Sequence, residues 1–175
     1  MGEITPTVKD KLSDEIYEKL AKLQPLEFRY GEIFYFDKDN IEEGQEGFRY
    51  NPIKQEVIED WTGDEYVIIG HDESIGDGPD PIIIKIDDPK LPVFYFATEY
   101  EDWSKPTQIA NSLDDYIAIM DKIAQYADDI ADTNLSEENF KSLMEEIGKL
   151  NTSSYWNGFL EKAVVGYYDQ FDEEN

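Results

Sequence analysis

The sequence predicts an α+β fold: an N-terminal helix, a curved antiparallel sheet, and C-terminal helices packed on that sheet. Three apolar runs, rich in β-branched and aromatic residues and separated by turn residues, follow one another within 66–97. Such runs are typical of buried strands joined as a meander. Apolar residues at helical spacing lie before and after them. No other part of the 175 residues is as apolar, so we expect the rest of the chain to pack on this stretch.

The N-terminal segment has the pattern of one amphipathic helix. Thr5 and Pro6 suit a capped first turn, and Pro25 ends the pattern. The apolar positions recur every three or four residues, which is the spacing of one helix face. They are Val8, Leu12, Ile16, Leu20 and Leu23.

Short extended segments are predicted between this helix and the apolar runs. Aromatic and β-branched residues gather in them, and glycine, asparagine and proline separate them. The strand candidates are 28–30, 33–36, 48–50 and 57–61. Turns are expected at 37–47, with room for one helical turn at 40–43, and at 62–64.

The apolar runs themselves occupy 66–70, 81–86 and 93–97. An acidic turn rich in glycine and proline, 71–80, joins the first two, and its glycines supply the backbone conformations that a tight connection needs. We expect His71 to be a polar residue of this turn.

Helices are predicted for most of the C-terminal part. Ser112 with Asp115 resembles a capping box, and the apolar face of the helix that it opens continues to Ile130. Ser136 begins a second helix that continues to Leu150, and a last helix is expected from Tyr155 to about Val165.

Composition excludes several classes of protein. There is no cysteine, so no disulfide framework or thiolate nucleophile is available. No apolar run reaches 18 residues, and the N-terminus lacks the pattern of a secretory signal. We therefore expect a cytoplasmic protein that does not contact membranes.

The charge points to a basic partner. Fifteen basic residues stand against 41 acidic ones, a net charge of −26. Residues 31–80 alone hold 15 acidic and 3 basic residues. Direct nucleic-acid binding is disfavoured because phosphates need basic patches. An acidic surface instead accelerates and orients the approach of a basic protein. The alternative is an acidic face that serves solubility alone.

The sequence contains only weak matches to catalytic, metal-binding and phosphate-binding motifs. His71 is the only histidine, and no nucleophile elbow accompanies it. The 71–80 turn lacks the ligand spacing of a calcium loop, and its glycines lack the lysine of a phosphate loop. Accidental carboxylate pairs are unavoidable among 41 acidic residues. We expect no catalytic residue, no metal and no cofactor.

Aromatic residues lie among the carboxylates of 31–80. Phe48, Tyr50 and Trp61 are candidates for exposed aromatic side chains there. Aromatic rings beside carboxylates suit contact with a surface rich in lysine and arginine.

Several segments together resemble a known family. Residues 44–52 read GQEGFRYNP, similar to a GQEGY…NP segment. Trp61, then 67–70 and 80–82, are similar to a strand, Gly-Asp-Pro, strand pattern, and 109–113 resemble an IA-x-S entry into a helix. These are features of the SUKH superfamily, which includes bacterial immunity proteins and fungal cell-wall-assembly regulators. The resemblance covers about 33–120. We expect one domain, 1–175, with a helical extension over about 121–168 and a frayed acidic tail at 169–175.

The resemblance implies an immunity protein that binds and neutralises a polymorphic toxin, often a nuclease. Nucleases are basic around their phosphate sites, and an inhibitor of charge −26 suits such a surface. The first alternative is a regulatory or scaffold domain that binds a cellular protein. The second is a hydrolase with a carboxylate pair.

We expect the partner to contact acidic residues of 42–80 together with two aromatic anchors. The predicted contact residues are Glu42, Glu43, Glu46, Tyr50, Asp60, Asp64, Asp72, Glu73, Asp77, Asp80 and Trp103. The oligomeric state is left open.

Overall fold

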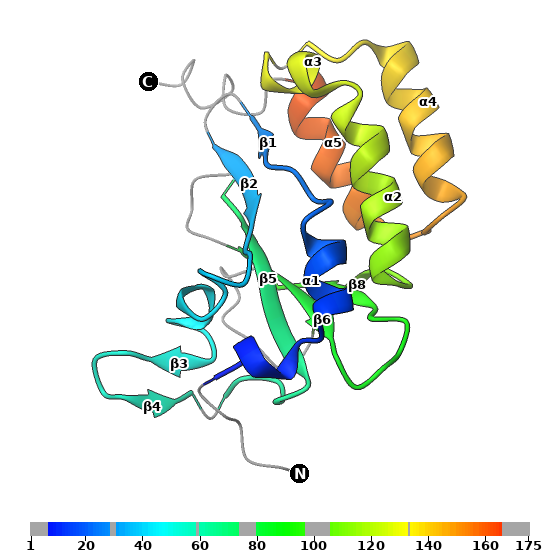
Figure 1. Ribbon diagram of the computed structural model, residues 1–175. Helices are drawn as coiled ribbons and strands as arrows, with labels where there is room; N and C mark the ends of the chain where they lie inside the picture. The colour runs from blue at the N-terminus through cyan, green and yellow to red at the C-terminus, as the bar shows by residue number, and fades with distance from the viewer. Residues whose placement is uncertain are drawn as a thin grey trace, which may run out of the picture.

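The computed structural model describes residues 7–28, 31–58, 60–73, 80–96, 106–132 and 134–165. Its described strands form a six-stranded antiparallel sheet in the order β1-β2-β5-β6-β7-β8. Helices α2 to α5 gather on one side of the sheet, and a separate hairpin, β3 with β4, projects away from them (Figure 1). The predicted α+β class, with a curved sheet and C-terminal helices, is confirmed.

The predicted meander is the centre of the sheet. It consists of β5 (Tyr66–Asp72), β6 (Asp80–Lys85) and β7 (Val93–Tyr95). The central isoleucines of β5 and β6 are fully buried, which explains why these segments are nearly continuous apolar runs. A bulge interrupts the pairing of β5 with β6 between Ile68 and Gly70. β8 (Thr107–Ala110) pairs with β7 and was not predicted.

The other edge of the sheet consists of β1 (Leu26–Glu27) and β2 (Glu32–Tyr35). β2 agrees with the predicted strand at 33–36 and pairs with the end of β5, where Ile33 opposes Asp72. The other candidate at this edge began at Phe28, but the described strand β1 ends at Glu27; residues 29 and 30 lie outside the described part of the chain.

The prediction of one continuous N-terminal helix is wrong. A 3₁₀ turn, η1 (Lys9–Lys11), and a separate helix, α1 (Asp14–Leu20), replace it. Leu12 between them has extended backbone, and the Ser13 hydroxyl caps α1 by accepting a hydrogen bond from the amide of Ile16. The apolar spacing continues across the break because both pieces pack on one core. Thr5 and Pro6 lie outside the described residues.

The prediction that His71 is a polar turn residue is also wrong. His71 lies in β5, where it pairs with Phe34 of β2 and Pro81 of β6. Phe48 and Trp61, predicted as exposed aromatic residues, are both buried. Their rings contact His71 and Phe96, which are distant in the sequence.

The C-terminal helices begin near the predicted caps. The hydroxyls of Ser112 and Ser136 each accept the amide hydrogen three residues later, at 3.0 and 3.1 Å. The pattern predicted as one helix to Ile130 is divided at Gln125 and Tyr126. The helices are α2 (Leu113–Ala124), α3 (Ala127–Ala131), α4 (Glu137–Gly148) and α5 (Tyr155–Val165).

The sheet is covered on both faces. Strand pairing places Tyr35 and Tyr95 on the face that meets α2 and α5, where they contact Tyr116 and Tyr155. The opposite face carries His71, which meets the irregular segment 36–61. That segment contains η2 (Glu43–Gln45), β3 (Tyr50–Asn51) and β4 (Glu56–Val57). It holds five of the eleven predicted contact residues, at positions 42, 43, 46, 50 and 60.

Candidate partner-binding surface

The segment 42–60, called the hairpin unit below, carries four exposed carboxylates. Glu43 begins η2, Glu46 follows it, Glu56 lies in β4 and Asp60 comes just after β4. All four side chains belong to exposed residues, whereas the ring of Tyr50, in β3, is half-buried. A bridge between residues 46 and 50 joins the η2 turn to the hairpin. Three of these four acidic residues were predicted contacts; Glu56 was not.

A buried glutamine attaches this unit to the sheet. Gln45 has 0% exposure, and its amide nitrogen donates to the carbonyl of Ile68 at 2.8 Å. Its amide oxygen accepts the Ile68 N–H at 3.1 Å. β2 ends at Tyr35, so the Gln45 amide takes the place of a strand peptide beside β5. The same nitrogen donates to the carbonyl of Ile41.

The glycines beside Gln45 fit this arrangement. A Cβ on Gly44 would lie 2.3 Å from the ring of Phe36, so only glycine allows the turn to pack on that ring. Gly47 has φ of +86°, a conformation that residues with side chains rarely adopt. The GQEG segment thus has a structural explanation, which is to seat η2 against the sheet.

An ion-pair cluster lies at the base of the hairpin. Arg49 has 0% exposure, and its Nη2 donates to the Asp64 carboxylate at 2.6 Å. Lys11 from η1 binds the same carboxylate. Burial lowers the pKa of the Arg49 guanidinium, and the charge of Asp64 opposes that effect. Nε and Nη1 of Arg49 have no hydrogen-bond partner within the described part of the chain. Asp64, a predicted contact, therefore holds the hairpin base.

Glu42, another predicted contact, is also engaged within the chain. One of its carboxylate oxygens accepts the amide hydrogens of Val8 and Lys9, at 2.7 and 2.5 Å. These bonds connect the N-terminal segment to the turn before η2, and they explain why η1 begins where it does.

The remaining described candidates lie at the other end of β5. Asp72 and Asp80 oppose each other across β5 and β6, and Asp72 is only 3% exposed. The Tyr95 hydroxyl donates to the Asp80 carboxylate at 2.7 Å. Glu73 is half-buried, and its amide donates to the Glu32 carbonyl. Asp77 and Trp103 lie outside the described residues.

Several buried tyrosines lie close to the carboxylates at this end of β5. The hydroxyls of Tyr35 and Tyr116 are 2.8 Å apart, and the rings of Tyr95 and Tyr155 are 4.8 Å apart. Burial, assisted by the negative charge of Asp72, raises the pKa of Tyr35, Tyr116 and Tyr155. These phenols stay protonated at neutral pH and connect the sheet to α2 and α5. The predicted contacts are thus divided between an exposed hairpin unit and a largely internal network.

His71 lies among three phenylalanine rings. Its ring centroid is 5.7 Å from Phe34, 5.0 Å from Phe36 and 5.4 Å from Phe48. Burial lowers the pKa of His71 to about 4, although a hydrogen bond to the backbone of Gly44 acts in the opposite direction. Its Nε2 has no hydrogen-bond partner in the described residues. The side chain is a neutral packing group at neutral pH.

This environment predicts acid sensitivity. The unfolded chain binds a proton at His71 near pH 6.5 and the folded chain only near pH 4, so stability decreases as the pH falls through this window. We expect His71 to account for a loss of up to about 3 kcal/mol between pH 7 and 4. Urea unfolding of wild type and His71→Leu at several pH values measures the difference. Parallel pH profiles for the two proteins would contradict this account.

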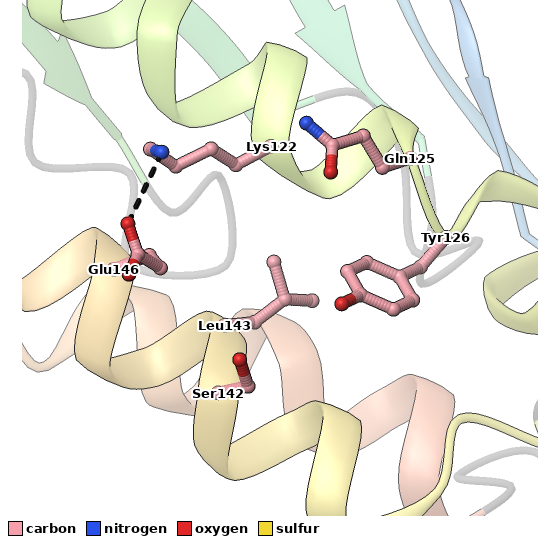
Figure 2. A pocket seen from close by; sticks show the side chains of 6 residues that line it. All are labelled: Lys122, Gln125, Tyr126, Ser142, Leu143 and Glu146. Carbon is pink, nitrogen blue, oxygen red and sulfur yellow. Dashed lines mark hydrogen bonds and ion pairs between the residues drawn. The ribbon is translucent and has the colours of Figure 1, made fainter.

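A polar cleft of about 300 Å³ lies between α2 and α4, lined by Lys122, Gln125, Tyr126, Ser142, Leu143 and Glu146. The Lys122–Glu146 ion pair lies at one end and the Tyr126 ring at the other (Figure 2). Hydrogen bonds from Lys149 and Lys122 lower the pKa of Glu146, which keeps it a carboxylate. The cleft offers hydrogen bonds and a neutralised ion pair, without a carboxyl group poised to act as a general acid near neutral pH.

Comparison with protein-family models, curated proteins and solved structures found no match to this chain. Among the described helices, none combines the length and apolar character needed to cross a membrane. No three histidine, cysteine, aspartate or glutamate side chains of the described residues are grouped so that they could hold a metal ion.

Proposed function

We propose that this chain is a non-enzymatic binding domain for a basic protein, and that it acts as a SUKH-like immunity protein that neutralises a basic toxin. The observation that carries the proposal is the unit 42–60, where Glu43, Glu46, Glu56 and Asp60 belong to exposed residues of one projecting element. Buried contacts of Gln45 and Arg49 fix this element to the sheet. A rigid acidic surface loses little conformational entropy on binding, which favours tight association.

The distribution of cations supports the same proposal. Carboxylates pair with Lys11, Lys19, Arg49, Lys85, Lys122, Lys141 and Lys149. With 41 acidic residues against 15 basic ones, these pairs leave a large carboxylate excess. That excess repels other acidic surfaces and attracts basic ones, such as the phosphate-binding surface of a nuclease.

Reversing the charge of the hairpin unit is expected to slow association with the partner. For the variant Glu43→Lys/Glu46→Lys/Asp60→Lys, we expect the association rate constant at low salt to decrease by roughly tenfold or more, because electrostatic steering is lost. The rate should also depend less steeply on ionic strength. Stopped-flow or surface-based kinetics across a salt series, with the partner purified from the source organism, measures both effects.

The matched control is Asp121→Lys/Glu138→Lys/Glu145→Lys. It changes the net charge equally, but its exposed positions lie on α2 and α4. We expect a much smaller decrease, since only the overall charge has changed. Equal decreases in the two variants would show that net charge, and not the hairpin unit, attracts the partner.

A further inference from the structure

We infer that the β3–β4 hairpin inserts Ile53 into an apolar pocket of the basic partner, with the carboxylates of the hairpin and its base pairing to lysines or arginines at the rim of that pocket. This inference rests on the proposed function and names the contact element within it. Ile53 is 92% exposed and is the one large hydrophobic residue exposed to that degree in the described part of the chain. Sequence reasoning did not single it out.

The backbone holds Ile53 at the tip of the hairpin. The Asn51 side-chain oxygen accepts the amide hydrogens of Ile53 and Lys54, at 3.0 and 3.1 Å. Gln55 completes the reversal with φ of 55°, a left-handed conformation uncommon outside glycine. The pairing of Tyr50 with Val57 closes the two strands. The tip is therefore a defined turn that presents an apolar side chain to solvent.

The base of the hairpin is fixed as well. The Ile58 amide donates to the Arg49 carbonyl, and the Arg49 side chain is held by Asp64. Figure 1 shows β3 and β4 extending away from the sheet and the helices. A projecting, pre-ordered element suits insertion into a concave surface, because little freedom is lost when it docks.

The charges of the hairpin indicate what kind of partner surface would receive Ile53. Glu46 precedes the hairpin, Glu56 lies in β4, and Asp60 follows β4. An apolar centre with a charged rim is the usual organisation of a protein interface, in which central apolar residues contribute most of the affinity. The matching surface is an apolar pocket bordered by basic residues on a folded protein.

The experiment places the photo-crosslinking residue benzoylphenylalanine at position 53 of the full chain, produced in the source organism. Position 141, on an exposed part of α4, is the control. We expect an adduct with a basic protein, identified by mass spectrometry, at position 53 and not at 141. The purified pair is then measured with Ile53→Asp and with Ile53→Val. We expect at least a tenfold loss of affinity for the first and near wild-type affinity for the second, with both variants folded.

Two results would overturn the inference. One is the absence of any adduct at position 53; the other is a basic partner that binds Ile53→Asp as tightly as wild type. If that partner is nevertheless lost on charge reversal at positions 43, 46 and 60, the proposed function stands and only the role of Ile53 fails. If no basic protein binds the wild-type chain, the proposed function fails with it.

Discussion

Replacement of Gln45 by alanine is expected to lower the free energy of unfolding by about 3–5 kcal/mol. The variant leaves the N–H and carbonyl of Ile68 without their partner, and each buried unpaired group costs roughly 1–3 kcal/mol. It also leaves a cavity at a fully buried site, which adds to the loss. Urea denaturation at neutral pH measures the change. A loss below about 1 kcal/mol would show that water replaces the amide and that Gln45 does not anchor η2.

Gln45→Glu separates hydrogen bonding from packing. The shape is kept, but a carboxylate would face the carbonyls of Ile41 and Ile68, to which the wild-type amide donates. Burial and these carbonyls raise the folded-state pKa of the new carboxyl. As the pH falls, the folded chain therefore binds this proton at a higher pH than the unfolded chain does. The variant should therefore recover stability relative to wild type between pH 7 and 5. A loss of stability that does not change with pH would contradict the hydrogen bonds assigned to the Gln45 amide.

Trp156→Ala is expected to cost about 3–5 kcal/mol and to loosen α5 from the sheet. Trp156 is 1% exposed, and its indole N–H donates to the Ile109 carbonyl at 2.8 Å. Its ring also contacts Tyr116 of α2 and the α5 residues Tyr155 and Phe159. Thermal unfolding, together with hydrogen exchange of the α5 amides, measures the two effects.

Trp156→Phe is the matched control for this site. It keeps most of the ring packing but leaves the buried Ile109 carbonyl without its donor, so we expect a smaller loss, roughly 1–3 kcal/mol. Equal losses for the phenylalanine and alanine variants would assign the whole effect to the hydrogen bond. A negligible loss for the alanine variant would show that α5 does not depend on this side chain.

Local signals predicted much of the fold. The meander follows from dense β-branched runs between turns, and α2 and α4 begin at Ser112 and Ser136 because those hydroxyls cap within their own turn. Long-range contacts caused the errors. The break after η1 accompanies hydrogen bonds from Val8 and Lys9 to Glu42, which no local pattern contains. β8 is short, and only its pairing with β7 defines it as a strand.

The candidate surface was less predictable than the fold. The sequence shows how many carboxylates there are, but not which ones have partners within the chain. Asp64 binds Arg49 and Lys11, and Asp72 is buried, although both belong to the same acidic stretch as Glu43. The residues next to His71 in the sequence are those of a typical turn, glycine before it and carboxylates after it. Cross-strand pairing nevertheless places its ring among aromatic rings. Tertiary packing decides these roles.

The central claim is that the acidic hairpin unit recognises a basic protein. Its most direct test is affinity capture from the source organism, with co-expressed neighbouring genes, at low and moderate salt. Wild type, the triple charge reversal at positions 43, 46 and 60, and the control on α2 and α4 are compared in parallel. We predict a stoichiometric basic protein retained by wild type and by the control, released as salt rises and absent from the reversal variant. Equal retention by all three proteins would contradict the claim.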